Sequence, residues 1–451
     1  MDIKKNDDIK LNIEAMTSEG SAVGHYNGVA VFVRGAVAGD EITAHIIKTS
    51  KSYCIGVIKD IIKKSPSRIE SDCPVSQKCG GCSFRNMTYE EELKYKRNRV
   101  RDAITRIGHL DIPVNEVIGA DKIDHYRNKA QYPVLISEGE LFAGFYAYKS
   151  HRIIPCRDCR LQDEEFEECL EAFSEWVKAG NITSYDERTG RGLLRHIYLR
   201  KASATKEIMA CAVVNGDRLP NENLLIEKLT RIDNVKSICV NINREKSNVI
   251  LGSETRVIWG SETITDELLG KRFVISPDSF YQVNHDQCEK LYAQAIEYAR
   301  LTGSETVIDL YCGTGTIGLS MADRAQKIFG VEIVPQAIEN ARKNAEINGI
   351  DNAEFFCGDA FDLAKELEAR SVRPDVVVLD PPRKGCRREL FDIIERMSPS
   401  RIVYVSCDSA TLARDLEILS GKGYRTEEIT PVDMFPRTPH VECVVLMSKA
   451  D

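Results

Sequence analysis

A cysteine and a glutamate near the C-terminus have the types and positions of a nucleophile and a base. Cys407 follows the apolar run 402–405, which predicts a buried strand, and it precedes a predicted helix at 409–422. A thiol between a parallel strand and a helix lies at the sheet edge where α/β proteins bind ligands, and a helix N-terminus favours the thiolate. Glu442 lies in another strand-like segment. A buried core cysteine and a solvent-facing glutamate would fit the same patterns, so the neighbouring motifs must be considered.

A glycine-rich turn upstream of this pair is typical of a nucleotide or nucleoside site. The strand-like segment 307–311 runs into the glycine-rich stretch 312–318, and Glu332 ends the next predicted strand. Glycines permit a tight turn and let a ligand approach the backbone, and a carboxylate at the end of the second strand can accept both hydroxyls of a ribose. Both NAD and S-adenosylmethionine would fit this turn.

The segment Asp380-Pro381-Pro382-Arg383 favours S-adenosylmethionine. It follows the fourth predicted strand of this region, where methyltransferases often carry Asp-Pro-Pro or Asn-Pro-Pro and NAD enzymes need no such segment. Arg383 occupies the position at which many amino-group methylases have an aromatic residue. This indicates a substrate with phosphates or carbonyl oxygens, and not an exocyclic amine.

A thiol, a base and a methyl donor together suit the methylation of carbon 5 of a uracil. That carbon is a poor nucleophile until a thiolate adds to carbon 6 and forms an enolate, which then accepts the methyl group. A base must afterwards remove the proton on carbon 5 so that the sulfur can leave. Cys407 and Glu442 would fill these two roles.

Three regions with different patterns are predicted along the 451 residues. Residues 1–62 read as short strands punctuated by glycines, which predicts a small five-stranded barrel of the oligonucleotide-binding type, with or without a nucleic-acid ligand. Residues 63–270 mix strands and helices and predict a central α+β domain. Residues 271–451 alternate strands and helices, which predicts a doubly wound, Rossmann-like and mostly parallel sheet.

The last region is predicted in more detail from its hydrophobic pattern. Strands are expected at 306–311, 327–332, 353–357, 374–380, 401–406, 425–431 and near 441–448. Helices are expected at 285–301, 317–325, 335–348, 387–397 and 409–422.

Basic side chains gather in two places that could contact RNA. A helix predicted at about 89–107 has an apolar face and a basic remainder. Arg127 and Lys129 lie among aromatic residues in the segment 125–132, and such a mixture can hold phosphates and stack bases. A solvated helix face and a polar strand with aromatic cross-strand pairs are the alternatives.

The composition predicts a soluble protein of the cytoplasm. The net charge is −8, so a nucleic acid must be held by a local basic patch. The first residues have no apolar core of a signal peptide, and no run approaches the ~18 apolar residues of a membrane span. The 15 cysteines therefore indicate a reducing compartment, where thiols serve as metal ligands, nucleophiles or core residues.

The chain resembles the RNA 5-methyluridine methyltransferases, the uracil-C5 family, over nearly its whole length. The motifs that carry the resemblance are Phe280-Tyr281-Gln282-Val283-Asn284, Asp309-Leu310-Tyr311-Cys312-Gly313-Thr314-Gly315, Val331-Glu332, Asp380-Pro381-Pro382-Arg383, Ser406-Cys407-Asp408 with Thr411-Leu412-Ala413-Arg414-Asp415, and His440-Val441-Glu442. The resemblance implies that Cys407 is the nucleophile and Glu442 the base. Together with the glycine-rich turn it gives the predicted cofactor-binding residues, which are Gln282, Tyr311, Gly313, Gly315, Thr316, Glu332, Asp359 and Asp380. The predicted RNA contacts are Arg127, Lys129 and Arg383.

Two residues beside the nucleophile depart from the family pattern. Asp408 stands where some members have asparagine, and Ser409 replaces a common proline, which would alter the turn near the thiol. The N-terminal barrel resembles a TRAM domain, an RNA-binding module of many such enzymes. The family further implies that the basic helix near 89–107 packs against the catalytic domain, so that this domain would be discontinuous.

A cluster of cysteines resembles the iron–sulfur site of the ribosomal branch of the family. Cys73, Cys79 and Cys82 lie close in sequence, and the resemblance gives Cys159 as the fourth ligand of a [4Fe-4S] cluster, with Cys156 as its competitor. Cys79, Cys82, Cys156 and Cys159 could instead form a zinc site, which would leave Cys73 unused. The spacing is not the Cys-x3-Cys-x2-Cys of radical enzymes.

The resemblance therefore predicts a cytoplasmic, S-adenosylmethionine-dependent enzyme that methylates carbon 5 of a uridine in 23S ribosomal RNA. No membrane and no obligatory protein partner are expected. The alternatives are a transfer-RNA uridine methylase, a non-catalytic RNA-binding assembly factor that has kept the fold, and an iron–sulfur redox protein.

Overall fold

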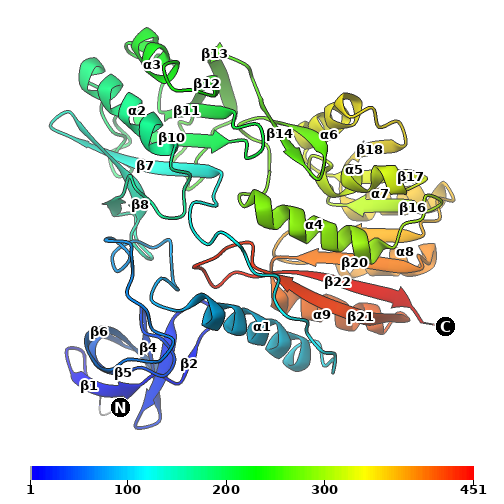
Figure 1. Ribbon diagram of the computed structural model, residues 1–451, viewed down its shortest axis with the longest axis horizontal. Coiled ribbons are helices and arrows are strands. Elements are labelled where there is room, and N and C mark those ends of the chain that lie inside the picture. The colour runs from blue at the N-terminus through cyan, green and yellow to red at the C-terminus, as the bar shows by residue number, and fades with distance from the viewer. Residues whose placement is uncertain (1–2, 451) are drawn as a thin grey trace.

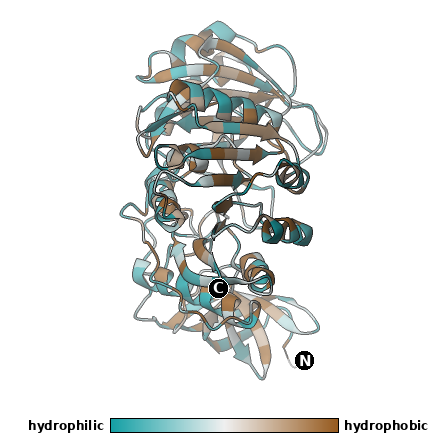
Figure 2. Ribbon diagram, turned by 90° about the vertical axis from the view of Figure 1, so that its right-hand side faces the viewer, coloured by the Kyte–Doolittle hydropathy of each residue, from teal (hydrophilic) through white to brown (hydrophobic). Residues whose placement is uncertain are grey.

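The computed structural model describes residues 3–450, which form three regions in chain order. Figure 1 shows a β-rich N-terminal unit in blue, a central sheet with two helices in cyan to green, and a larger C-terminal α/β unit in green to red. Figure 2 shows brown, hydrophobic stretches along the strands and helices, and teal in many of the joining loops. Among the described residues, every helix is too short or too polar to cross a membrane.

The N-terminal unit is a sheet of six strands in the order β1-β5-β6-β4-β3-β2. Its strands are β1 (Asp8–Asn12), β2 (Ala15–Met16), β3 (Ala22–Tyr26), β4 (Val29–Val33), β5 (Glu41–Thr49) and β6 (Tyr53–Lys63). Buried residues alternate along β5 and place Ile42, Ala44 and Ile46 in the core, as expected for a strand with one solvated face. The sheet has one strand more than the expected barrel, because the short β2 pairs with β3 at its edge.

The central region is a sheet of seven strands in the order β13-β12-β11-β10-β7-β8-β9. Its elements are β7 (Lys129–Ser137), β8 (Glu140–Tyr146), β9 (Ile153–Pro155), α2 (Phe166–Gly180), β10 (Leu194–Lys201), β11 (Ile208–Val214), α3 (Glu222–Leu229), β12 (Val235–Ile242) and β13 (Glu254–Gly260). Phe173 and Trp176 of α2 pack into the core of this sheet with Tyr132. The hairpin of β14 (Ile264–Leu268) and β15 (Lys271–Ile275) leads into the next region.

The C-terminal region has the predicted doubly wound sheet, with strand order β18-β17-β16-β19-β20-β22-β21. Its strands are β16 (Thr306–Leu310), β17 (Lys327–Glu332), β18 (Ala353–Cys357), β19 (Val376–Leu379), β20 (Arg401–Ser406), β21 (Tyr424–Val432) and β22 (Glu442–Lys449). The strands from β16 to β20 are parallel, whereas β22 is antiparallel to both of its neighbours. The chain order reverses between β16 and β19, and ligands bind at such a point, outside the carboxyl ends of the strands.

The helices of this region are α4 (His285–Ala299), α5 (Thr316–Met321) with a 3-10 turn (Ala322–Arg324), α6 (Pro335–Ile347), α7 (Ala360–Ala369), α8 (Arg388–Met397) and α9 (Ser409–Ser420). The sequence prediction did not include α7. This helix begins after Asp359, whose carboxylate accepts a hydrogen bond from the Phe361 N–H at 3.0 Å, and it buries Ala364 and Leu367. Two successive parallel strands need a crossover between them, usually a helix, so the topology could have predicted α7.

Helix α1 (Tyr89–Arg106) packs on the C-terminal region and not on the central sheet that follows it in the chain. Val100 and Ile104 share a hydrophobic core with Leu412 and Leu416 of α9. After α1, a Cβ on Gly108 would lie 2.9 Å from the carbonyl oxygen of Ala413, so the two backbones approach closely. The C-terminal unit is therefore built from two separate segments of the chain.

The loop after β19 is tied to α9 by a buried carboxylate. Asp415 accepts hydrogen bonds from the Cys386 N–H at 3.0 Å and from the Tyr404 hydroxyl at 2.6 Å, and it pairs with Arg414 at 2.6 Å. Gly385 lies against this pair with φ +73°, and a Cβ there would lie 2.6 Å from Asp415 Oδ2. The loop can therefore stay in place only if residue 385 has no side chain.

Replacing Gly385 with alanine should lower the free energy of unfolding by about 2–5 kcal/mol, because the new methyl group both strains a left-handed backbone and overlaps the carboxylate. The free energy is measured by urea unfolding. Gly349→Ala is the matched control: φ is +63°, and a Cβ there meets no atom within 4 Å. The control should lose only about 1–2 kcal/mol, from backbone strain alone. Equal losses in the two variants would contradict the close contact at Gly385.

Candidate active site

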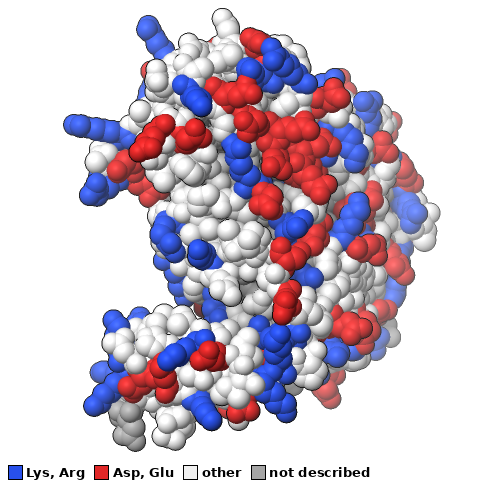
Figure 3. All heavy atoms as spheres, turned by 60° about the vertical axis from the view of Figure 1, so that its left-hand side comes forward, with Lys and Arg blue, Asp and Glu red and all other residues white. Residues whose placement is uncertain are grey.

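A cavity of about 1350 Å³ opens at the carboxyl edge of the C-terminal sheet. All three regions contribute to its walls, including Glu19 from the N-terminal unit and Gly81 from the segment that follows it. Figure 3 shows the molecule hollowed between the N-terminal unit, at the bottom, and the other two regions. Blue Lys and Arg side chains lie beside this hollow, whereas red Asp and Glu gather farther up. The open side of the molecule is thus more basic than its net charge suggests.

Cys407 and Glu442 lie on neighbouring strands at the same end of the sheet. In the antiparallel register of β20 and β22, Ser406 is opposite Cys443. In an antiparallel pair the next two opposite residues are then Cys407 and Glu442, so these two are neighbours. Both side chains line the cavity, and Glu442 is only 5% exposed. The strand pairing brings together the two residues that the sequence indicated as nucleophile and base.

The turn that carries Cys407 is held by Asp408. This residue caps α9: its carboxylate accepts hydrogen bonds from the N–H groups of Ala410 at 3.0 Å and Thr411 at 2.9 Å. A side-chain cap of this kind fixes the start of a helix. Helix α9 therefore begins at Ser409 without the proline that is common in the family.

Burial and like charge shift the pKa values around the nucleophile. Burial raises the pKa of Glu442 to about 8; the nearby Asp380 adds to the shift, and Arg383 opposes it. Burial also raises the pKa of Asp380 to about 7. The pKa of the Cys407 thiol is raised to about 11, first by burial and then by the charges of Glu442 and Asp380. A cation that enters the cavity would therefore favour the thiolate and both carboxylates.

The glycine-rich turn faces open space. Tyr311 and Gly313 have positive φ angles of 68° and 55°. Glu332 holds the turn: its carboxylate accepts the Gly313 N–H at 3.2 Å and the Val334 N–H at 2.9 Å. A Cβ on Gly313 would meet no atom within 4 Å, so the backbone here can be approached by a ligand.

The structure places all but one of the predicted cofactor-binding residues at the cavity. Those that line it are Gln282, Tyr311, Gly313, Thr316, Glu332, Asp359 and Asp380. Gly315 is the exception: with φ 83° it precedes α5, and its N–H donates to the Cys312 carbonyl at 2.8 Å. Its role is to shape the turn.

The three predicted RNA-contact residues, Arg127, Lys129 and Arg383, also line the cavity. The backbone of Arg127 bridges to Gln162 of the central region and to Asn284 of the C-terminal region. Lys129 is half-buried beside Arg127 and Arg200, and its pKa is lowered to about 8, first by burial and then by these two cations. Arg127, Lys129 and Arg200 thus bring three positive groups together near the junction of the central and C-terminal regions.

Two further wall residues, Phe280 and His440, were not predicted as site residues. Phe280 is 68% exposed, which is unusual for a phenylalanine next to a cavity. Burial, with Arg383 and Arg99 nearby, lowers the pKa of His440 to about 4, so its imidazole is neutral at physiological pH. Both residues lie inside motifs that carry the family resemblance, and these motifs could have identified them as site residues.

The predicted ligand cysteines come from two segments that lie together. Cys79 forms a backbone bridge with Ala147, close to the strand that leads to Cys156 and Cys159. Burial is the main cause that raises the pKa of the Cys79 thiol, and the nearby Cys159 and Cys73 add to the shift. Within residues 3–450, however, no group of three or more His, Cys, Asp or Glu is arranged to hold a metal ion. The iron–sulfur and zinc hypotheses both stay predictions.

The cysteine segment is also tied to the N-terminal unit. The Arg34 guanidinium donates hydrogen bonds to the carbonyl oxygens of Cys79 and Cys82, each at 3.0 Å. The same guanidinium lies over the ring of Tyr148, at 4.4 Å from its centre. This segment therefore connects the N-terminal unit to the central sheet.

Comparison with known proteins relates the chain to RNA methyltransferases. A sequence model of the family described as tRNA (Uracil-5-)-methyltransferase matches residues 88–450. An uncharacterized RNA methyltransferase of Clostridium tetani is 44% identical over 99% of this chain and 97% of its own length. Another, of Clostridium acetobutylicum, is 46% identical over 100% of this chain and 98% of its own length.

A solved structure agrees with these sequence relatives. The Pyrococcus abyssi tRNA (uracil-54, C5)-methyltransferase in complex with S-adenosyl-L-homocysteine is similar with a TM-score of 0.78 and 29% sequence identity. The match covers 97% of this chain and 100% of that chain. The chain belongs to the family of S-adenosylmethionine-dependent RNA (uracil-5-)-methyltransferases.

Proposed function

We propose that the chain methylates carbon 5 of a uridine in 23S ribosomal RNA, with Cys407 as the nucleophile and Glu442 as the base. The observation that carries this proposal is the adjacency of the two side chains at the ends of β20 and β22. A thiol and a carboxyl group side by side in one cavity wall can act on two adjacent ring carbons. Uracil-C5 methylation needs this pair of groups.

The reaction proceeds in three steps. The Cys407 thiolate adds to carbon 6 of the uracil, and the electron pair of the ring double bond moves into an enolate. Carbon 5 then bonds to the donor's methyl carbon, while the electrons of the old carbon–sulfur bond leave with the donor's sulfur. Glu442 removes the proton from carbon 5, the double bond forms again, and the Cys407 sulfur leaves as thiolate.

The glycine-rich turn fits S-adenosylmethionine. The open space at Gly313 admits a ligand close to the backbone, and the two Glu332 oxygens, which each accept one N–H, retain lone pairs for ribose hydroxyls. When bound, S-adenosylmethionine supplies an electrophilic methyl group on a positively charged sulfonium. Asp380 and Glu442 would favour this positive charge.

The target uridine has to leave its base stack to reach Cys407, because the thiol lies inside a cavity. Arg127, Lys129 and Arg383 would hold phosphates of the flanking nucleotides. We further propose that the N-terminal unit is a TRAM domain that extends the RNA contact. Two of its residues, Ser18 and Glu19, line the cavity, which supports this role.

Transfer RNA is the second candidate substrate. The cysteine cluster, which resembles the iron–sulfur site of the ribosomal branch of the family, supports ribosomal RNA. The Pyrococcus abyssi structure favours the alternative, because its match includes the N-terminal unit and its described target is uracil 54 of tRNA. The substrate assay below separates the two.

Labelled methyl groups should be transferred to 23S ribosomal RNA when total RNA from cells without this enzyme is the substrate, and digestion should give 5-methyluridine. The pairing of Cys407 with Glu442 in one cavity is the reason to expect 5-methyluridine, and the cysteine cluster is the reason to expect ribosomal RNA. Mapping of the labelled base is the measurement. Label confined to transfer RNA would contradict the ribosomal substrate, and absence of 5-methyluridine would contradict the reaction.

The control variants for this assay are two cysteine substitutions. Cys407→Ala should abolish transfer while RNA binding persists, and it should no longer form a covalent adduct with RNA that contains 5-fluorouridine. Cys357→Ala, at an exposed cysteine, should behave as wild type. Full turnover by Cys407→Ala would exclude the thiol mechanism. The same experiment tests the alternative of a non-catalytic RNA-binding factor, which would bind RNA without transferring methyl groups.

The rate of methyl transfer should rise as the pH increases from about 6 to 9. With a pKa of about 8, Glu442 is mostly protonated below that pH, and only its carboxylate can accept the proton from carbon 5. The fraction of Cys407 thiolate rises over the same range. The measurement is kcat/KM as a function of pH. A rate that falls across this window would contradict Glu442 as the base.

We also propose that Cys73, Cys79, Cys82 and Cys159 hold a [4Fe-4S] cluster. Cysteine thiolates are the usual ligands of such a cluster. The two segments that carry these cysteines lie together, with Cys73 and Cys159 near Cys79, which also supports the proposal. The cluster would fasten the segment that Arg34 connects to the N-terminal unit. It takes no part in the reaction steps above.

Purified protein should contain iron and show the visible absorbance of an iron–sulfur cluster. Cys73→Ser should lose both signals, because it removes one of the four thiolates, whereas Cys156→Ser should keep them. Iron content and absorbance are the measurements. Zinc that is lost in Cys156→Ser and kept in Cys73→Ser would establish the zinc alternative instead.

A further inference from the structure

The loop between β21 and β22, residues 433–441, carries part of the cavity wall and leads directly to the base. Phe435, Thr438 and His440 of this loop line the cavity, and β22 begins at Glu442 immediately after it. Strand pairing fixes the register of Glu442, and the path of this loop, which enters β22 at that residue, contributes to the exact position of its carboxyl group.

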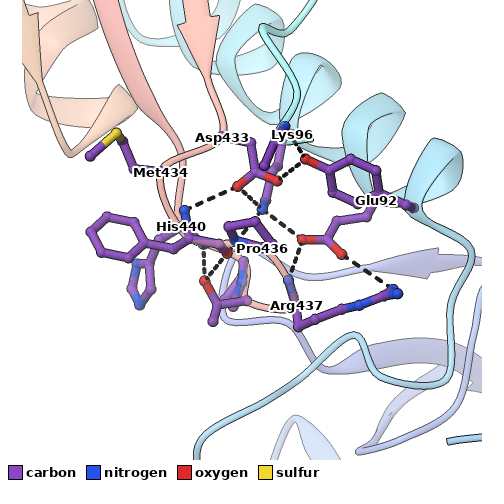
Figure 4. A network of polar contacts seen from close by, with 12 residues as sticks. Glu92, Lys96, Asp433, Met434, Pro436, Arg437 and His440 are labelled. Carbon is purple, nitrogen blue, oxygen red and sulfur yellow. Dashed lines mark hydrogen bonds and ion pairs between the residues drawn. The ribbon is translucent and has the colours of Figure 1, made fainter. Parts of the chain in front are cut away.

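The first residue of the loop is held by α1. The Lys96 ammonium lies 2.6 Å from Asp433 Oδ1 and 2.7 Å from Glu92 Oε1, and all three side chains are 0% exposed. The Tyr89 hydroxyl donates to the second oxygen of Asp433 at 2.8 Å. Figure 4 shows Lys96 reaching from α1 between the two carboxylates.

The same groups reach the backbone of the loop farther along. Lys96 donates to the Phe435 carbonyl at 3.2 Å, and the Arg437 N–H donates to Glu92 at 2.7 Å. The Phe435 N–H donates to Asp433 at 3.1 Å. From the next turn of α1, Arg99 donates to the Pro439 carbonyl at 2.6 Å. Hydrogen bonds from one helix thus follow the loop along most of its length.

Stability alone is a weak reason for this arrangement. Glu92, Asp433, Lys96 and Arg437 are two carboxylates and two cations, with Arg437 at 3.9 Å from Glu92, so the buried set is neutral. Well-packed apolar side chains would often stabilise a core as well as buried ion pairs do. Directional hydrogen bonds, however, fix the position of a backbone segment in a way that apolar contacts do not.

We propose that Glu92, Lys96 and Asp433 are positioning residues for Glu442. They act through the loop and set the distance between the Glu442 carboxylate and the proton on carbon 5. None of the three is among the residues that line the cavity. The inference rests on the proposed function, because that function makes Glu442 the base.

The proposal predicts which reaction step suffers. Cys407 is held by the Asp408 cap, which the network does not touch, so nucleophilic attack and methyl transfer should proceed. Proton removal should become slow. The covalent intermediate, with Cys407 bonded to carbon 6 of a methylated ring, would then accumulate on ordinary uridine.

The test is the double variant Lys96→Met/Asp433→Asn, which removes one cation and one carboxylate and leaves the neutral pair Glu92–Arg437. Its melting temperature should stay near that of wild type, while turnover falls about 100-fold, the size of effect that a misplacement of about 1 Å can have. A covalent enzyme–RNA adduct on RNA without fluorouridine should accumulate. Thermal unfolding, turnover assays and denaturing gels with labelled RNA measure these three quantities.

Two single variants complete the design. Asp102→Asn lies on the same helix with its side chain 48% exposed, and it should match wild type in turnover and in adduct level. Tyr89→Phe removes only the hydroxyl group, which donates to Asp433 and also accepts the Ala120 N–H at 2.7 Å. It should show the same accumulation to a smaller degree, and it keeps the proposal testable if the double variant does not fold.

The outcomes separate this inference from the proposed function. Wild-type turnover in a folded double variant would overturn the positioning role. Loss of turnover without adduct on ordinary RNA would overturn it too, because an earlier step would then be affected. A wild-type enzyme that makes no 5-methyluridine in the same assay would instead refute the proposed function.

Discussion

The antiparallel pairing of β22 with β20 is the constraint on which the site depends. The parallel strands β16 to β20 all end at one edge of the sheet, whereas β22 begins there, so its first residue is beside the residue that follows β20. A slip of one residue in this register would turn Glu442 to the opposite face. The almost entirely buried run of β22 specifies the register, because any shift would expose or misplace its apolar side chains.

This geometry places several acidic groups in a poorly hydrated space. Asp380 and Glu442 have raised pKa values because burial disfavours their charged forms. The pKa of Asp309 is raised to about 8 for the same reason, although it accepts the Gly318 N–H at 2.9 Å and thereby shapes the glycine-rich turn. Asp380 and Glu442 also line the cavity, and such carboxyl groups are well suited to a cationic ligand. The electrostatics of the cavity thus agree with the family's sulfonium donor.

Local patterns predicted the doubly wound sheet, and they predicted that Cys407 and the glycine-rich turn lie at the ends of its strands, because strand runs and turn glycines are short-range features. The sequence could not show that Cys407 and Glu442 are neighbours, since this depends on β22 inserting between β20 and β21. Helix α7 was missed because its amphipathic pattern is short. The basic character of α1 suggested RNA contact, yet Lys96 is fully buried against Asp433. Only the tertiary fold shows which basic side chains face solvent.

The contribution of α1 to the C-terminal unit has a consequence for the order of folding. Lys96 and Asp433 are 337 residues apart, and the entire central sheet is synthesised between them. A nascent chain emerges from the ribosome N-terminus first, so the central region can fold while α1 still lacks the surface that buries Val100 and Ile104. Bringing such distant segments together is entropically slow. The helix must therefore remain undocked, with its apolar face exposed, until α9 and the loop after β21 have been translated.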